Sequence, residues 1–244
     1  MPAQRRLRAV RTVPRETAAA SPSDASPDFP SKRKEAPRLY VLAGANGAGK
    51  SSIAGAMFRE SGAAYFNPNE AARRLREKNP VLNQTQANSA AWHTGKALLE
   101  RAIAQGQDFA IETTLGAATI PRLLADAAAR GFAVRIWFAG LATPELHLKR
   151  VRARVRSGGH DIPERDVRRR FEHSRINLIL LLPSLTALRV YDNSAEAGPA
   201  AGNTPEPMLV LHMENGKIIA PEDLSRTPQW AKPIAAAAMK MQRA

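Results

Sequence analysis

The chain has 244 residues, of which 44% are hydrophobic, and this is enough for one domain with a substantial core. Its formal net charge of +14 favours phosphate-rich partners, namely nucleotides, nucleic acid or an anionic surface. Because the chain contains no cysteine, disulfides, thiolate metal sites and thiol nucleophiles are excluded.

Composition divides the chain into three segments. Residues 1–37 are rich in Arg, Ala, Ser and Pro, so we expect a disordered basic tail and favour a solvated tail over contact with nucleic acid. Residues 38–220 are expected to form the main domain, and residues 221–244 a peripheral C-terminal tail. Neither a secretory signal nor an apolar run of bilayer length is visible, so we expect a cytoplasmic chain without a membrane partner.

Strand and helix patterns alternate in the main domain. Apolar strands are expected at residues 38–44, 63–67, 109–112, 133–140 and 187–192, followed by a hairpin over 208–219. Helices are expected at residues 50–59, 67–78, 87–106, 119–130, 144–157 and 162–183. Asn67 is expected to cap the second helix in a capping box with Glu70. This alternation indicates an α/β fold with a mostly parallel sheet and helices on both faces.

A phosphate-binding motif lies between the first strand and the first helix. The sequence GANGAGKS fits G-x-x-x-x-G-K-[ST], in which backbone N–H groups close around phosphate oxygens. Lys50 should reach the β- and γ-phosphates, and the Ser51 hydroxyl can hold Mg²⁺. The expected nucleotide-binding residues are Gly44, Ala45, Asn46, Gly47, Ala48, Gly49, Lys50, Ser51 and Ser52.

Cations crowd the segment RVRARVRSGGHDIPERDVRRRF, residues 150–171. Two arginine-rich helices joined at Gly158-Gly159 can close over a nucleotide as a lid, where guanidinium groups spread over the charge of the transferring phosphoryl group. A solvated basic face and contact with nucleic acid are the alternatives. His160, beside the glycine pair, is the one histidine near this chemistry, and a structural role is favoured for it.

Polar residues follow the strand that ends in FAIE. Glu112 lies at the edge of the sheet where open α/β folds bind ligands, so its carboxylate can accept hydrogen bonds from sugar hydroxyls or pair with a lid arginine. Thr113 and Thr114 can contact substrate or simply form the turn. Trp92 is interpreted as a core or pocket-wall residue rather than a stacking platform.

Several of these motifs occur together in a known family. The phosphate loop, YFNPNEAARRL, FAIETTL, the arginine segment and VYDNS follow one another as in zeta-toxin-like small kinases, so residues 39–194 resemble that family. The resemblance implies a P-loop kinase that uses ATP and Mg²⁺ to phosphorylate a hydroxyl of UDP-N-acetylglucosamine or a related sugar nucleotide. It also makes an antitoxin or another protein a candidate partner.

The resemblance assigns roles to individual residues. It implies that Arg154 and Arg170 act with Lys50 and Glu112 in catalysis, and that Glu112, Thr113 and Asn69 bind the substrate. It places the VYDNS segment near the nucleotide base, where a simple turn is the equal alternative.

The chain departs from the family at Asn69, where members carry the aspartate that deprotonates the acceptor. Three interpretations stay open: Glu70 or Glu112 replaces the base, the loose transition state needs no strong base, or the protein is slow, inactive or acts on another acceptor. An ATP-switched nucleic-acid-binding protein and a catalytically weak pseudo-kinase are the remaining alternatives.

Overall fold

The computed structural model describes residues 35–55, 62–63, 65–196 and 205–243. These residues belong to one compact unit, Glu35–Ala244. Most of the basic tail predicted for residues 1–37 lies outside the described residues, as does part of the helix predicted for 50–59.

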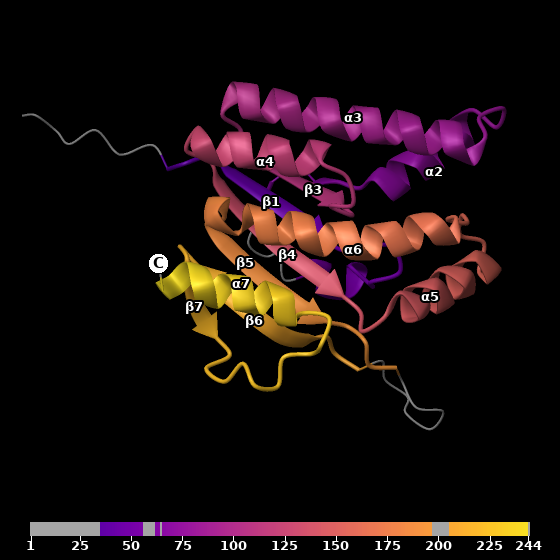
Figure 1. Ribbon diagram of the computed structural model, residues 1–244. Coiled ribbons are helices and arrows are strands. Elements are labelled where there is room, and N and C mark those ends of the chain that lie inside the picture. Colours follow the sequence, from indigo (N-terminus) through magenta and orange to yellow (C-terminus); the bar gives the residue numbers. More distant parts are fainter. Residues whose placement is uncertain (1–34, 56–61, 64, 197–204, 244) are drawn as a thin grey trace, which may run out of the picture. The chain divides into compact units, whose positions relative to one another are not determined.

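Within the described ranges, the strands form one mixed sheet. They are Arg38–Ala43 (β1), Tyr65–Phe66 (β2), Phe109–Thr113 (β3), Ala133–Gly140 (β4), Ala187–Asp192 (β5), Met208–Glu214 (β6) and Lys217–Ala220 (β7). Their order in the sheet is β2-β3-β1-β4-β5-β6-β7 (Figure 1). The strands from β2 to β5 pair in parallel, whereas β6 and β7 extend the sheet as an antiparallel hairpin. The predicted α/β fold with a mostly parallel sheet is therefore confirmed.

Most of the described helices pack on one face of this sheet. The labelled helices are Pro68–Lys78 (α2), Gln84–Gln105 (α3), Thr119–Ala129 (α4), Pro144–Arg156 (α5), Glu164–Leu181 (α6), the 3-10 turn Leu182–Ser184 (η1) and Lys232–Arg243 (α7). Along that face α3, α4, α6 and α7 lie side by side (Figure 1), and they bury Leu99, Leu124, Leu178 and Ile234 in the main core. None of the helices in the described part of the chain combines the length and apolarity that crossing a membrane requires.

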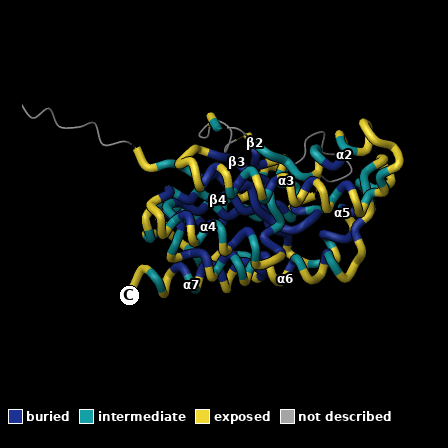
Figure 2. The backbone as a smooth tube through the Cα atoms, turned by 90° about the horizontal axis from the view of Figure 1, so that it is seen from above, coloured by how far each residue is buried: buried dark blue, intermediate teal, exposed yellow. Residues whose placement is uncertain are grey.

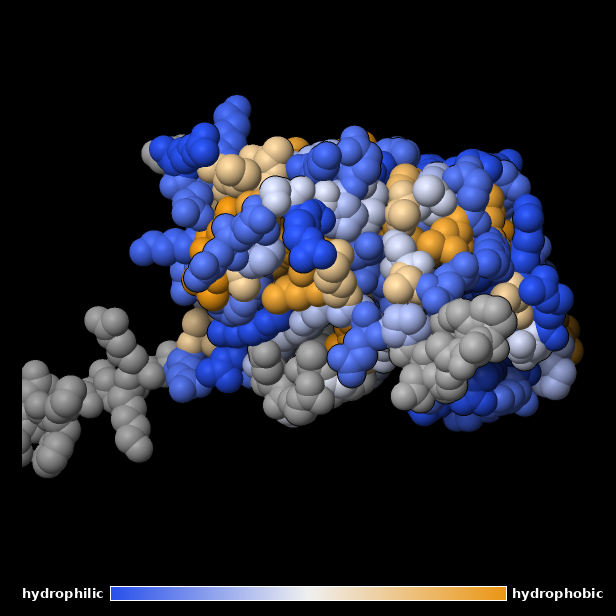
Figure 3. Space-filling view, turned by 90° about the horizontal axis from the view of Figure 1, so that it is seen from below, coloured by the Kyte–Doolittle hydropathy of each residue, from blue (hydrophilic) through white to orange (hydrophobic). Residues whose placement is uncertain are grey.

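The opposite face of the sheet carries a second, smaller core. Residues 51–55 are helical and contribute Ile53, which packs with Tyr40 of β1 and Trp137 of β4. The strands are buried between these two layers, and the exposed positions follow the outer sides of the helices (Figure 2). The view from below shows a mainly hydrophilic surface interrupted by separate hydrophobic patches (Figure 3).

Helix starts follow local capping chemistry, with one difference from the sequence prediction. Asn67 caps α2 by accepting hydrogen bonds from backbone N–H groups, as expected. Glu70, however, pairs with Arg74 on the exposed side of the helix. A complete capping box occurs instead at α3, where Asn83 and Gln86 bond reciprocally, so this helix begins three residues earlier than predicted.

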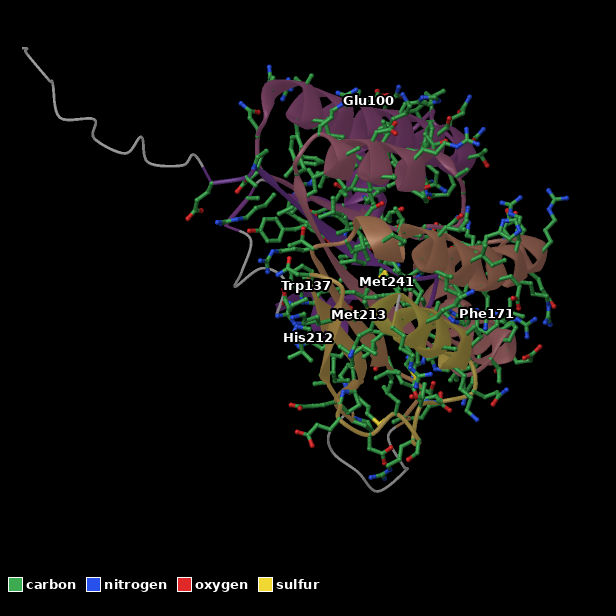
Figure 4. All side chains as sticks on the ribbon, turned by 60° about the vertical axis from the view of Figure 1, so that its left-hand side comes forward. Glu100, Trp137, Phe171, His212, Met213 and Met241 are labelled. Atoms are coloured by element: carbon green, nitrogen blue, oxygen red, sulfur yellow. The ribbon has the colours of Figure 1, made fainter. Side chains whose placement is uncertain are left out.

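The C-terminal segment, which the sequence suggests is peripheral, packs into the main core. Trp230 is only 4% exposed, and its ring stacks on Phe138 of β4 with 6.3 Å between ring centroids. A Cβ atom at Gly140 would lie 2.2 Å from the Trp230 ring, so a glycine is needed at this strand end. Met213 of β6 belongs to the main core, and the partly buried Met241 of α7 packs against this core (Figure 4). The apolar side of α7, with Ile234 and Ala238, therefore packs against the main core.

We expect Trp230→Ala to lower the free energy of unfolding by about 3–5 kcal/mol, because it empties a ring-sized volume beside Phe138. Denaturant titration followed by circular dichroism measures this loss. Met239→Ala is the control on α7, since this side chain is 38% exposed and its truncation should cost about 0.5 kcal/mol or less. Equal effects of the two substitutions would contradict the packing described for the C-terminal segment.

Candidate active site

The phosphate loop connects β1 to the helical residues 51–55, at the carboxyl end of the parallel strands. Gly44 opens the loop with φ at 136°, and a Cβ atom there would lie 2.1 Å from the carbonyl oxygen of Ala139. The loop can therefore leave β1 only because its first residue is glycine. Ser51 and Ser52 are exposed at the start of the helix, where backbone N–H groups and the helix dipole favour an anion.

Two buried side chains hold the loop from outside. The Nδ2 group of Asn193 donates a 3.0 Å hydrogen bond to the carbonyl of Ala48. Nδ1 of His147 lies 2.7 Å from the carbonyl oxygen of Asn46, and because a carbonyl only accepts, Nδ1 carries the proton. These bonds fix two loop carbonyls with protein donors and so hold the loop in its conformation.

Lys50 is buried beneath the loop. Its Nζ donates to the carbonyl of Gly44 at 3.0 Å and lies 3.5 Å from Oε1 of Glu112. Burial lowers the pKa of Lys50, and the carboxylate of Glu112 opposes this shift. The ammonium group is thus placed at the loop by one neutral oxygen and one charged oxygen.

Glu112 gathers donors from three directions around its buried carboxylate. Oε2 accepts hydrogen bonds from the hydroxyl of Tyr65 and from Nδ2 of Asn67, each at 3.0 Å. Oε1 faces Lys50 and accepts a longer bond of 3.4 Å from Nδ2 of Asn69. Burial, together with the nearby carboxylate, raises the pKa of Tyr65. The carboxylate therefore joins the phosphate loop to the residues that precede and begin α2.

Two arginines of the α5–α6 segment turn toward the phosphate loop. Nη1 of Arg170 donates to Oδ1 of Asn46 at 2.7 Å. Arg154 makes only a 3.5 Å contact with the carbonyl of His160, and its buried Nε has no hydrogen-bond partner. Burial lowers the pKa of both guanidinium groups, and both act electrostatically on Lys50. Two carboxylates, Glu112 and Asp166, only partly offset these three cations, so the cluster is a favourable place for phosphate.

Most of the other cations of α5 and α6 are exposed and have partners, whereas Arg165 lines the cavity described below. Arg168 pairs with Glu145 and Glu164, Arg152 with Glu164, Arg169 with Asp166, and Lys149 with Glu196. Arg156 is exposed. The crowded charge expected from the sequence is thus largely offset by carboxylates on the outer surface, and the half-buried Arg154 and Arg170 are the two arginines that act on Lys50.

A cavity of about 900 Å³ opens beside Lys50 and brings most of the predicted catalytic and substrate residues together. Its walls come from the phosphate loop, α2, α3, the end of β3, the start of α4 and the α5–α6 connection. Among the residues lining it are Asn46, Lys50, Asn69, Glu112, Thr113 and Arg170. Arg154 is absent from the lining and reaches the site through its charge and its contact with His160.

Several site residues were missed by sequence reasoning. Tyr65 and Asn67 support Glu112, and His147 braces the loop, yet no motif marked these roles. Asn193, for which the sequence left open a place near the nucleotide base or a simple turn, contacts the loop backbone, and its position after a parallel strand was the available signal.

A parallel sheet with a phosphate loop after β1 and an arginine-bearing helix pair beside it defines the class of P-loop kinase folds. The family comparison is more specific, because the zeta toxin family model matches residues 23–198. The chain belongs to the zeta toxin family, as the sequence resemblance indicated.

Individual proteins are also similar to this chain. An uncharacterized protein of Haemophilus influenzae is 31% identical over 134 residues, which cover 55% of this chain and 92% of that protein. The crystal structure of AvrRxo1-ORF1:AvrRxo1-ORF2 with sulphate ions is similar, with a TM-score of 0.58 and 16% identity over 85% of this chain and 75% of that chain.

Two further structures share the fold. The AvrRxo1-ORF1:-ORF2 complex with ATP has a TM-score of 0.59 and 17% identity over 83% of this chain and 63% of that chain. The PezAT chromosomal toxin-antitoxin system of Streptococcus pneumoniae has a TM-score of 0.50 and 16% identity over 88% of this chain and 90% of that chain. At these identities the likeness concerns the fold.

The buried His147 makes stability depend on pH. Burial, opposed by the bond to Asn46, lowers its pKa to about 4, below the ordinary value of about 6.5. Between these values the unfolded chain binds a proton that the folded chain does not, so stability falls with falling pH. Below pH 4 the folded chain binds the proton as well, so the stability loss caused by His147 levels off at about 3 kcal/mol.

We expect His147→Gln to lose this dependence, because the amide can donate to Asn46 but does not titrate. Denaturant titrations of both proteins between pH 7 and pH 4 measure the difference. His173→Gln, at an exposed position on α6, is the matched control and should follow the wild type. Parallel curves for wild type and His147→Gln would refute the assignment.

Proposed function

We propose that the protein is an ATP-dependent phosphotransferase that phosphorylates a hydroxyl group of a small molecule. The observation that carries this proposal is the position of Lys50, which is buried under the phosphate loop and borders the cavity of about 900 Å³. One side of the lysine is suited to a triphosphate, and the other opens on a space for an acceptor. Family membership supports the same reaction type.

ATP is the proposed phosphoryl donor. The loop amides and Lys50 would bind its β- and γ-phosphates, and the solved relative with ATP supports this choice of nucleotide. Ser51, exposed at the first turn after the loop, fits the role of the protein ligand for Mg²⁺. When bound, Mg²⁺ offsets charge on the β- and γ-phosphate oxygens.

Arg154 and Arg170 are proposed to stabilise the moving phosphoryl group. The acceptor oxygen forms a bond to the γ-phosphorus while the bond from that phosphorus to the β,γ-bridging oxygen breaks, and ADP leaves with the electron pair. Charge spreads over the phosphoryl oxygens during this step, and guanidinium groups held near Lys50 offset it. Arg170 is held by a neutral oxygen of Asn46, so it can move to a phosphate without breaking an ion pair with that residue.

The acceptor is proposed to be UDP-N-acetylglucosamine or a related sugar nucleotide. Glu112 and Thr113 at the end of β3 and Asn69 on α2 line the same cavity as Lys50. Their side chains offer hydrogen-bond acceptors and donors to sugar hydroxyls. On the α3 wall, Trp92 is 38% exposed, although the sequence suggested only a core or wall role. A nucleobase could stack on this ring, and Arg76 and Lys96 line the same cavity as cations for a diphosphate.

A protein partner of the antitoxin class is also proposed. The support is that PezAT, which shares the fold, is described as a toxin-antitoxin system. A catalytically weak kinase is the second candidate function, and Asn69 in place of the family's aspartate favours it.

Lys50→Ala should reduce phosphotransfer by about a hundredfold to a thousandfold, because it removes the cation that contacts the transferring group. Glu112 keeps three neutral donors in this variant, so the chain should remain folded. Incubation with labelled ATP, Mg²⁺ and a panel of sugar nucleotides, followed by separation of products, measures transfer. Lys149→Ala is the control, since this lysine pairs with Glu196 on the outer surface. Retained transfer in folded Lys50→Ala would overturn the mechanism.

Trp92→Ala should raise KM for a nucleotide-linked acceptor about tenfold, because base stacking on an aromatic ring is worth about 1–3 kcal/mol. KM for ATP should not change, since Trp92 belongs to the α3 wall of the acceptor cavity. Trp92→Phe keeps an aromatic face and should lie near the wild type. Initial rates at varied acceptor and varied ATP separate the two constants, and a rise in KM for ATP alone would argue against this subsite.

A further inference from the structure

Asn69 leaves open which group takes the proton of the acceptor hydroxyl, because an amide does not accept one at neutral pH. The two carboxylates suggested by the sequence are poorly placed. Glu70 is paired with Arg74 on the exposed side of α2. Glu112 is surrounded by four donors, including Lys50.

Two other carboxylates line the cavity, and both have competing contacts. Oδ1 of Asp161, an exposed residue, accepts the backbone N–H of Ile162 at 2.8 Å. Asp166 pairs with Arg169 at 3.0 Å. The remaining titratable group of the cavity that can accept a proton is the imidazole of His160.

We propose that His160 is the general base that removes the proton from the acceptor hydroxyl. This inference rests on the proposed phosphotransferase function. It gives a catalytic role to a residue for which the sequence favoured a structural one, and it explains how the chain can retain turnover with Asn69.

The position of His160 follows from the helix pair. It lies in the connection between α5 and α6, directly after Gly158-Gly159, and lines the same cavity as Lys50 and Asn69. Its backbone carbonyl accepts the 3.5 Å contact from Arg154. Its ring forms no hydrogen bond within the described part of the chain, so a nitrogen lone pair is available to a ligand.

The same two arginines connect His160 with Lys50. Arg154 from α5 and Arg170 from α6 act electrostatically on both groups. Since these arginines are the proposed phosphoryl-binding residues, His160 lies within reach of their field and shares the cavity with Lys50. A base is needed at this place, where the acceptor oxygen approaches the phosphorus.

The surroundings keep the imidazole neutral near pH 7. Burial lowers the pKa of His160, Arg154 and Arg170 lower it further, and only Asp161 opposes them. The other charged groups lining the cavity are Lys50, Arg76, Lys96, Glu112, Arg165 and Asp166. A neutral imidazole can take up a proton, and a modest basicity suffices because the loose transition state requires its removal only late in the step.

The step balances in protons and electrons. The hydroxyl oxygen forms the new bond to the γ-phosphorus, the bond to the bridging oxygen breaks, and ADP departs with that electron pair. The hydroxyl proton passes to the free ring nitrogen of His160, giving an imidazolium ion that returns the proton to solvent after product release.

The first test compares pH profiles of kcat for wild type and His160→Gln with ATP, Mg²⁺ and the acceptor found in the labelled panel. Wild-type kcat should fall tenfold per pH unit below the lowered pKa of His160, because protonation removes the base. His160→Gln should lose about a hundredfold in kcat near pH 7 and should lack this acidic limb. ATP affinity, measured with a fluorescent nucleotide, and circular dichroism should be unchanged. His173→Gln on the exposed side of α6 is the control.

The second test restores a carboxylate. Asn69→Asp introduced into His160→Gln should recover kcat about tenfold or more, because it supplies a substitute base in the same cavity. Asn69→Asp in the wild-type background is the control, because an aspartate there can act as a base whatever His160 does. The gain in kcat should be larger in His160→Gln than in wild type, whereas a merely structural role of His160 would give equal gains. Wild-type-like kcat and an unchanged acidic limb in folded His160→Gln, or equal gains in the two backgrounds, would overturn the assignment while leaving phosphotransfer established. If the wild type transfers phosphate to no acceptor, the proposed function fails and the role of His160 fails with it.

Discussion

The ammonium of Lys50 and the carboxylate of Glu112 stand 3.5 Å apart beneath the phosphate loop, with side chains 10% and 11% exposed. Such a pair tolerates burial only when further hydrogen bonds satisfy the oxygens, because removing charges from water is expensive. Tyr65, Asn67 and Asn69 supply those bonds. The result is a single polar cluster that sets the distance between the phosphate side and the acceptor side of the cavity. A shift in β1, β3 or the start of α2 would disturb all its members together.

The cations of α5 and α6 are distributed unevenly around the phosphate loop. Carboxylates neutralise most of the outer cations, whereas Arg154 has an unpaired buried Nε and Arg170 contacts a neutral oxygen. Positive charge without an ion pair therefore lies close to the loop, and a cavity with low-dielectric walls strengthens the field of such charge. The net charge of +14 would by itself have suggested a diffuse attraction for anions.

Much of this arrangement could be predicted from sequence. The phosphate loop carries a local motif. Apolar residues recur at helical spacing on α5 and α6, and this spacing indicates the buried side of each helix, where Val151 and Phe171 lie. The choice of Arg154 and Arg170 came from the family resemblance. Contacts between distant segments left no such pattern: His147 meets the loop across 101 positions, and Asn67 meets Glu112 across 45. The C-terminal packing was missed because a segment containing Pro and Arg resembles a loop. Its anchor, Trp230, needs the space that Gly140 leaves on a distant strand, and no local pattern indicates this.

The end of β4 is compressed between two distant parts of the chain. A side chain at Gly44 would meet the backbone of Ala139, and one at Gly140 would meet the ring of Trp230. The first residue of the phosphate loop and the indole thus press on consecutive residues of one strand. During translation, the ribosome exposes the loop long before residues 230–243 are made, so in the nascent chain the end of β4 lacks its contact with Trp230 until those residues emerge. Tight binding of nucleotide should accordingly appear only after residues 230–243 have packed on the sheet.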